Sequence, residues 1–156
     1  NKFDQAIIDY VKRKHSLAIG EQTAEAVKIE IGSALATKEQ LTFELRGRDL
    51  VSGLPRDIAI KSNEIAEALT PFLLEIASSV QNVFNTTPPE LVADIMEKGL
   101  ILSGGGSQLR HLDEFFHRLT GVPTYLAEDP LFCVAKGAGL ILNHLDVYKR
   151  TLLTKR

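Results

Sequence analysis

Residues 100–107 read Leu-Ile-Leu-Ser-Gly-Gly-Gly-Ser, and this stretch decides the fold. Its three apolar residues predict a short buried strand, and the glycines that follow predict a turn. A helical pattern covers residues 109–119, a second apolar run at 122–126 predicts another strand, and residues 131–145 predict a last helix. The order strand, helix, strand, helix predicts neighbouring parallel strands joined by a right-handed crossover.

The glycine run is also a place where a ligand can approach the backbone, because no Cβ stands in the way. Ligands of open α/β sheets lie beyond the carboxyl ends of strands. The start of the following helix would add unpaired N–H groups and positive potential. A tight turn that uses glycine only for its shape is the alternative. No Gly-Lys-Ser/Thr follows, so the run is not a Walker A loop. The candidate residues here are Ser103, Gly104, Gly105, Gly106 and Ser107.

A second group of candidates lies on a helix expected over residues 22–33. Glu25 and Lys28 are three residues apart on one face, and Gly32 follows one turn later. As a surface ion pair, the two charges would contribute only about 0.3 kcal/mol. As a binding site, they would contact a ribose or a base edge, with Gly32 leaving room for a flat ring. The residues by themselves leave both interpretations open.

The rest of the chain predicts helices around a small antiparallel unit. Alternating residues at 40–46 and 56–61 predict two strands, with glycines at the turns between them. A long apolar periodicity begins after Ser62, a potential N-cap, and Pro71 is expected to bend or split that helix. Further helices are expected at residues 3–14 and, after a proline, at 89–97.

Composition excludes several classes of protein. The chain has 156 residues, of which 44% are hydrophobic and 24% charged, which is typical of a globular domain. Its net charge of −2 does not favour nucleic-acid binding. The single cysteine, Cys133, excludes an internal disulfide and is expected to be a buried thiol. No apolar run approaches the ~20 residues of a membrane-spanning helix. Because the chain begins at Asn1 and its only methionine is Met96, we expect a piece of a longer protein.

Taken together and in order, the motifs resemble the MreB family of bacterial actin homologues. The resemblance covers nearly all of residues 1–146, and paralogues within the family share most of its motifs. The motifs that carry it are Asp4, Ile19-Gly20-Glu21-Gln22-Thr23-Ala24-Glu25, Lys28, Ile31-Gly32-Ser33-Ala34, Arg46-Gly47-Arg48-Asp49-Leu50, Gly53-Leu54-Pro55-Arg56, Ser62-Asn63-Glu64-Ile65, Pro88-Pro89-Glu90-Leu91, Leu102-Ser103-Gly104-Gly105-Gly106 and Glu128-Asp129-Pro130-Leu131-Phe132-Cys133-Val134-Ala135.

The resemblance implies an α/β fold, namely the second half of an actin-like (ribonuclease H-like) ATPase. Residues 1–34 and 63–146 would form the larger subdomain of that half, and residues 35–62 a small inserted hairpin subdomain. Residues 147–156 would be a basic tail, expected to be disordered. The glycine run resembles the adenosine motif of the superfamily, and Glu25, Lys28 and Gly32 resemble its adenine and ribose contacts. The helix from Pro130 to Gly139 resembles a small-residue helix that packs behind the nucleotide.

The implied function is that of an ATP-binding, filament-forming cytoskeletal protein, which maintains rod cell shape by guiding cell-wall synthesis. ATP or ADP with Mg²⁺ would be the cofactor of the whole protein. This segment would have no catalytic residue, no metal ligand and no ATPase activity of its own, because the phosphate loops would lie upstream of Asn1. Expected partners are further copies in a filament, the cell-wall elongation machinery with a RodZ-type membrane adaptor, and the membrane through the missing half. The expected location is the cytoplasm, at the inner face of the bacterial plasma membrane.

Two other classes of protein share such a glycine motif. A sugar or acetate kinase of the actin-like superfamily would take its substrate into the interdomain cleft, and the half of a chaperone ATPase would carry a larger hairpin subdomain. The motifs at 46–49 and 88–91 favour the filament protein. Charges at Arg46, Arg48 and Asp49 would set the register of a filament contact.

Overall fold

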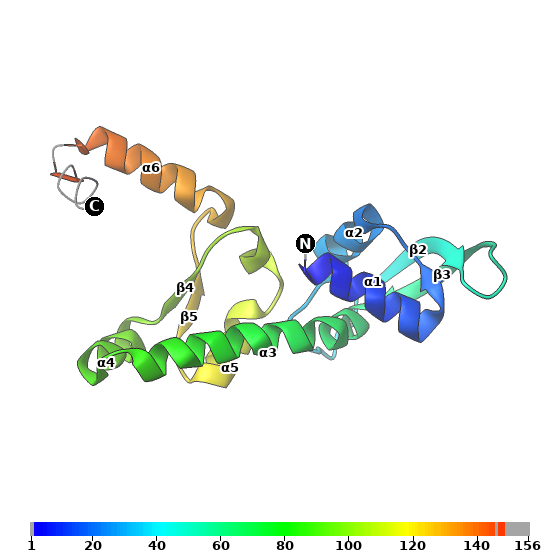
Figure 1. The fold of residues 1–156 in the computed structure, drawn as a ribbon, viewed down its shortest axis with the longest axis horizontal. Helices are drawn as coiled ribbons and strands as arrows, with labels where there is room; N and C mark the ends of the chain where they lie inside the picture. The colour runs from blue at the N-terminus through cyan, green and yellow to red at the C-terminus, as the bar shows by residue number, and fades with distance from the viewer. Residues whose placement is uncertain (1, 146, 149–156) are drawn as a thin grey trace.

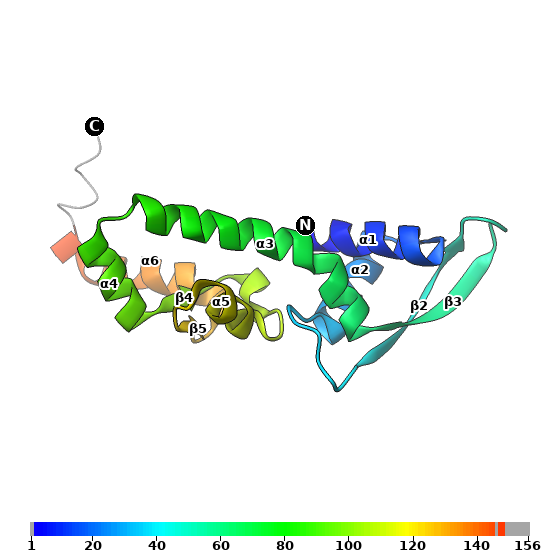
Figure 2. The ribbon, with the colours of Figure 1, turned by 90° about the horizontal axis from the view of Figure 1, so that it is seen from below.

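The computed structural model describes residues 2–145 and 147–148. One long helix joins two groups of elements, and Figures 1 and 2 show it running between them. The first group contains α1 (Lys2–His15), β1 (Leu17–Ala18), α2 (Glu21–Ile31), β2 (Thr42–Asp49) and β3 (Pro55–Lys61). The long helix is α3 (Ser62–Thr86). The second group contains α4 (Pro89–Lys98), β4 (Leu100–Leu102), the 3₁₀ turn η1 (Gly105–Gln108), α5 (Leu112–Thr120), β5 (Thr124–Leu126), the 3₁₀ turn η2 (Pro130–Phe132) and α6 (Cys133–Asn143).

The core lies where α1, α2, the hairpin and α3 meet, and it continues to α5. Apolar residues at helical spacing put one face of each helix into it, as the sequence predicts. Leu45 of β2 and Ile60 of β3 are fully buried in the same cluster as Val27 of α2 and Leu69 of α3. The hairpin is therefore anchored in the same core as the first two helices.

The expected antiparallel hairpin is confirmed, but β2 extends further than the sequence suggests. β2 pairs with β3, and β1 adds a third strand that pairs with the end of β2. Gly47 was expected in a turn and lies within β2 instead. A Cβ on Gly47 would stand 2.6 Å from the carbonyl oxygen of Ala18. Glycine is needed here because β1 approaches the strand closely.

α3 is a single helix with Pro71 in its interior, so of the two expected outcomes, a bend or a split, the split does not occur. Figure 2 shows the ribbon changing direction after its first turns, as a proline bend would. Ser62 is the first helical residue rather than the cap, and its Oγ accepts a hydrogen bond from the N–H of Leu41. The carboxylate of Glu64 accepts from the N–H of Lys61, the residue before the helix.

The predicted parallel pair is confirmed: β4 pairs with β5 in parallel, and α5 crosses between them. α5 begins only at Leu112, after η1 and a left-handed His111. The glycine run therefore does not lead directly into an α-helix. The prediction that a helix N-terminus faces the ligand at this turn is wrong, because the glycines themselves form the 3₁₀ turn.

α6 extends away from the other elements (Figure 1), and no residue of this helix is buried. Its small residues were expected to allow close backbone contact, but no atom lies within 4 Å of a Cβ built on Gly137 or Gly139. Cys133 is half-exposed rather than buried, because α6 has no neighbour that would cover it. The predicted tail falls mostly on 149–156, outside the described residues. Across the described part of the chain, no helix has the length and apolarity to cross a membrane.

Candidate adenosine pocket

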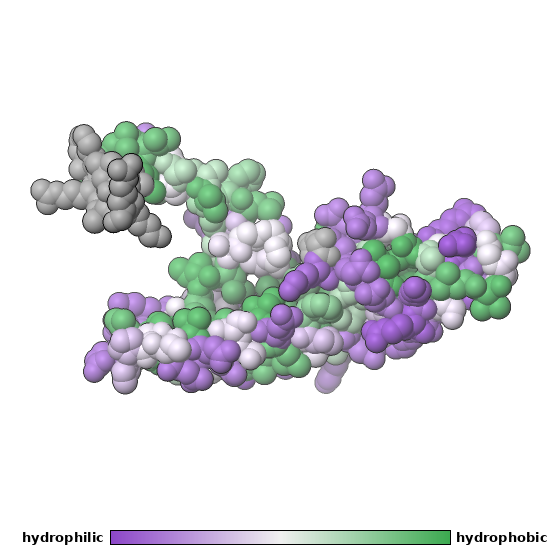
Figure 3. Space-filling model, in the orientation of Figure 1, coloured by the Kyte–Doolittle hydropathy of each residue, from purple (hydrophilic) through white to green (hydrophobic). Residues whose placement is uncertain are grey.

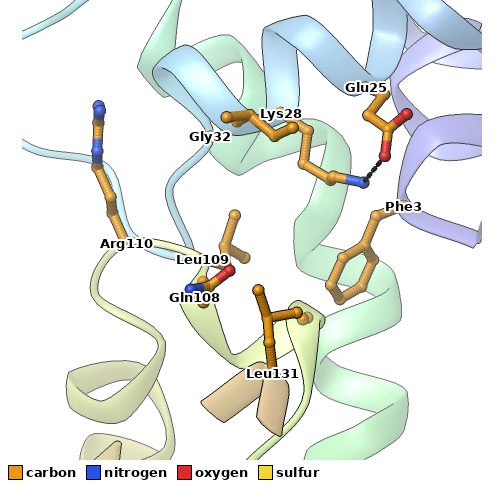
Figure 4. Close-up of a pocket in the computed structure, with 11 residues that line it drawn as sticks. Phe3, Glu25, Lys28, Gly32, Gln108, Leu109, Arg110 and Leu131 are labelled. Carbon is orange, nitrogen blue, oxygen red and sulfur yellow. Dashed lines mark ion pairs between the residues drawn. The ribbon is translucent and has the colours of Figure 1, made fainter. Parts of the chain in front are cut away.

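A pocket of about 410 Å³ lies between α2 and the glycine turn. This volume is within the range of small-molecule sites. Figure 4 shows Glu25 and Lys28 on one side, Leu131 opposite them and Phe3 of α1 at another edge. The lining residues are Phe3, Glu25, Lys28, Ile29, Gly32, Gly105, Gly106, Gln108, Leu109, Arg110 and Leu131.

The structure brings together five of the predicted residues and leaves three aside. Glu25, Lys28, Gly32, Gly105 and Gly106 line one pocket although two separate elements supply them. Ser103, Gly104 and Ser107 are not among the lining residues. Ser107 is buried, and its Oγ donates to the carbonyl oxygen of Gly104 at 2.6 Å, so this side chain closes the turn from inside. Ser103 is exposed beside it.

The three glycines of the turn differ in their backbone angles and in the atoms that surround them. Gly104 has a φ of +85° and a ψ of 169°, a conformation that is open essentially only to glycine. A Cβ on Gly105 would stand 3.2 Å from a methyl group of Leu131. A Cβ on Gly106 would meet no atom within 4 Å, yet this residue lines the pocket and has no positive φ. Neither packing nor backbone strain explains glycine at 106, and its role as a ligand contact stays a prediction.

Gly32 has a structural reason of its own. It follows α2, and its N–H donates to the carbonyl oxygen of Lys28 at 3.0 Å. A Cβ on Gly32 would stand 2.1 Å from that oxygen and 3.0 Å from Leu109. The close approach of the Lys28 carbonyl group therefore requires glycine here, whether or not a ring binds beside it.

Lys28 has a partner that the sequence pattern did not reveal. Its Nζ donates to Oδ1 of Asp4 at 2.7 Å, and the two side chains are only 16% and 9% exposed. The expected partner, Glu25, is 60% exposed, and its Oε1 lies 4.0 Å from the same Nζ (Figure 4). The surface pair predicted by three-residue spacing is thus the weaker of two contacts. Asp4 is 24 residues away in sequence, which hides this pairing from any local pattern.

Sequence reasoning also missed the apolar part of the lining. Ile29 stands next to Lys28 and is 69% exposed, and Leu131 is 59% exposed. Phe3 reaches the pocket from α1, and Gln108 and Leu109 follow the glycines after Ser107. Large apolar side chains left in solvent next to candidate polar residues are a signal of a binding site. Exposure, however, becomes visible only in the folded chain. Arg110 points away from the facing pair of charges in Figure 4.

Another group of charged side chains joins α1 to α3. The hydroxyl of Tyr10 donates to Glu67 at 2.7 Å, and Lys14 donates to the same carboxylate at 3.2 Å. These two donors hold the pKa of Glu67 below its usual value, and burial raises the pKa of Tyr10. None of the three lines the pocket, and their contacts tie the two helices together. No cluster of three or more potential metal-binding side chains occurs among the described residues.

A family model described as MreB/Mbl protein matches residues 1–150. This chain belongs to the MreB/Mbl family. The cell shape-determining protein MreB of Escherichia coli K12 is 46% identical over 155 residues, which are 99% of this chain and 45% of that relative. The chain thus spans less than half the length of the MreB relatives it matches. The resemblance found from the motifs is confirmed, and the kinase and chaperone alternatives lose their support.

Solved structures agree with the MreB assignment. MreB5 of Spiroplasma citri bound to ADP matches 99% of this chain and 46% of its own, with a TM-score of 0.90 and 35% identity. The same protein bound to AMPPNP gives a TM-score of 0.91 and 36% identity. The MamK double helical filament, at 21% identity and a TM-score of 0.66, supports the fold alone. The expected fold, part of an actin-like α/β protein, is confirmed.

Proposed function

We propose that this chain supplies the adenosine side of an ATP or ADP site in a filament-forming cytoskeletal protein. The observation that carries the proposal is Gly106, which lines a pocket of suitable size and around which a Cβ would meet no protein atom. The solved MreB5 structures, bound to ADP and AMPPNP, support it from outside. The remaining candidate contacts are Glu25, Lys28, Gly32 and Gly105 in the pocket, with Ser103, Gly104 and Ser107 shaping the turn behind it.

The chemistry of the lining suits a nucleoside better than a phosphate. Phe3, Ile29, Leu109 and Leu131 offer apolar surface to a planar base, and Glu25 with Lys28 offers an acceptor and a donor to sugar hydroxyls. The ammonium of Lys28 is already neutralised by Asp4. We therefore assign phosphate and Mg²⁺ binding, and the slow hydrolysis of ATP, to parts of the whole protein outside this chain.

The experiment is a titration of the isotopically labelled chain, followed by NMR, with adenosine, AMP and ADP. All three ligands should shift the amide signals of Gly105, Gly106 and Lys28, and their affinities should agree within about threefold because the pocket contacts only the shared adenosine. Guanosine is the control for base selectivity. Absence of any shift at these residues up to millimolar adenosine would refute the proposal.

The larger role proposed for the whole protein is assembly into filaments that maintain cell shape. Membership of the MreB/Mbl family supports self-association, and the names of the cell shape-determining relatives support a role in cell shape. Guidance of cell-wall synthesis, a RodZ-type adaptor and a position at the inner face of the plasma membrane belong to the proposal. We expect the hairpin region 35–62 to form part of the contact between subunits.

A further inference from the structure

Lys28 lies between two carboxylates, Asp4 and Glu25, that differ in how far they are exposed to solvent. Asp4, in the first turn of α1, is nearly buried and accepts a hydrogen bond from the ammonium. Glu25 is mostly exposed and lies 4.0 Å from the ammonium, which is too far for a hydrogen bond. The hydrogen bond to Asp4 therefore holds the ammonium of Lys28 apart from Glu25, which precedes it on the same helix face.

This arrangement leaves binding capacity free at the pocket wall. An ammonium has three N–H donors, and the bond to Asp4 uses one of them. Glu25 retains its acceptor oxygens toward solvent. An ammonium and a carboxylate that face each other across 4.0 Å can bind one hydroxyl or two neighbouring hydroxyls from both sides. A vicinal diol fits such a pair, because each hydroxyl both donates and accepts.

We infer that Asp4 is a positioning residue, which holds Lys28 away from Glu25 so that the 2′- and 3′-hydroxyls of a ribose can enter between them. The inference rests on the proposed adenosine site, and it names the part of the ligand that Lys28 and Glu25 would bind. Asp4 does not line the pocket, so it acts through Lys28. Without the charge of Asp4, Lys28 would swing toward Glu25, three residues away on the same helix. The direct pair would then compete with the sugar.

A purely structural role for Asp4, tying α1 to α2, makes a different prediction. A loosened helix would weaken every ligand of the pocket alike. Loss of a positioned diol site instead removes the preference for ribose over deoxyribose. The ratio of two affinities therefore separates the two roles, whereas a single affinity does not.

The test compares the wild-type chain with Asp4→Asn, which keeps the size and one oxygen of the side chain but removes its charge. The probes are adenosine, 2′-deoxyadenosine and 3′-deoxyadenosine, titrated into the labelled chain. Wild type should prefer adenosine about tenfold over each deoxy form, the usual effect of losing a hydrogen bond to a charged group. Asp4→Asn should bind adenosine about tenfold more weakly and the deoxy forms nearly unchanged, which brings the ratio close to one. Asp9→Asn is the matched control on α1, because Asp9 bonds to Gln5 and lies outside the pocket lining.

An unchanged preference for adenosine in folded Asp4→Asn would overturn the inference and leave Asp4 with a structural role. If Asp4→Asn does not fold, Asp4→Ser takes its place, since serine is tolerated in the first turn of a helix. Failure of both variants to fold also overturns the inference. Failure of the wild-type chain to bind adenosine refutes the adenosine site itself, which is a different result from binding without discrimination.

Discussion

Single glycines in the turn at 104–106 can be separated by substitution. Gly106→Val should weaken adenosine binding at least tenfold, because the branched side chain would fill the space left for the ligand. Its free energy of unfolding should change by less than about 1 kcal/mol, since no protein atom obstructs the new Cβ. NMR titration gives the first quantity and chemical denaturation the second.

Gly104→Ala is the matched control for this substitution. Its backbone conformation excludes other residues, so alanine should cost about 1–3 kcal/mol of stability. Its effect on ligand affinity should be small among the molecules that remain folded. If Gly106→Val binds adenosine as wild type does, then glycine at 106 has nothing to do with the ligand.

Asp49 gives the chain a defined response to acid. Its Oδ1 accepts hydrogen bonds from the N–H groups of Ser52 and Val51, and its Oδ2 lies 2.6 Å from Arg56. These contacts, the backbone bonds first, hold the pKa of Asp49 below its ordinary value of 3.8. Between the folded and the unfolded pKa, the unfolded state binds more protons, so stability must fall as the pH drops through that window.

The measurement is the free energy of unfolding of wild type and Asp49→Asn between pH 5 and about pH 2.5, across the ordinary pKa of aspartate. Wild type should lose stability below about pH 4, and the variant, less stable at pH 5, should show a shallower loss. Parallel curves would show that Asp49 does not contribute to the acid response. The same contacts correct the expectation that Asp49 offers charge to a filament partner, because its carboxylate is buried and occupied by its own turn.

For single residues, the sequence predicts which of them are candidates for the site better than it predicts which side chains they contact. The glycine run and Glu25 with Lys28 could be found because each is a local pattern. Asp4 could not be assigned to Lys28, since the packing of α1 on α2 brings them together and no spacing rule reaches 24 residues. Likewise, the sequence does not reveal that the side chain of Ser107 faces inward, because that depends on the 3₁₀ turn.

Among the elements, the hairpin shows best how packing joins segments that are distant in sequence. Leu45→Ala should lower the free energy of unfolding by about 2–5 kcal/mol, because the side chain is 1% exposed within the main cluster. Glu44→Ala, on the exposed face of the same strand, should change it by less than about 0.5 kcal/mol.

Unfolding of the Leu45→Ala variant, monitored separately at α1 and at β2, should also show one shared transition. Shared burial with Ile7 and Val27 makes the hairpin and the helices one cooperative unit. A separate early transition of β2 and β3 would instead make residues 35–62 an independent subdomain.

Sequence periodicity was sufficient to predict most helices and strands. It failed where contacts with a neighbouring element determine whether a strand forms or how far it extends. α1, α2, α3 and the β4–α5–β5 unit follow from apolar spacing alone. β1 is too short to show a pattern, and it exists because its two residues pair with the end of β2. The same neighbour explains why Gly47 continues the strand. α6 follows from the pattern as a helix, but its packing does not, since nothing in the described chain covers it.

At the scale of the whole molecule, two regions leave apolar side chains in solvent. Val51 and Leu54, at the hairpin end, are 88% and 65% exposed, and Val134 and Leu142 of α6 are 85% and 66% exposed. Figure 3 shows apolar surface along α6 and at the far end of the hairpin. Exposure of this extent is typical of interaction surfaces. A family whose relatives are more than twice as long offers two kinds of partner, the remainder of the same protein and the next subunit.

We expect the filament contact to involve the hairpin end and to depend on Arg48, which is exposed and has no ion pair among the described residues. End-to-end contact between different surfaces does not close on itself and produces open polymers. The experiment uses a protein of the relatives' length that contains this sequence, and it measures the amount of polymer that sediments with ATP. Arg48→Glu should reduce that amount at least severalfold, because a negative charge at this contact would repel the acidic groups that the arginine attracts. Lys12→Glu, an equal change of charge on an exposed residue of α1 outside residues 35–62, is the control. Unfolding should be unaffected in both variants, since Arg48 is exposed and the contacts that close the hairpin belong to Asp49. Wild-type polymer yield from Arg48→Glu, or equal loss in the two variants, would exclude this residue from the contact.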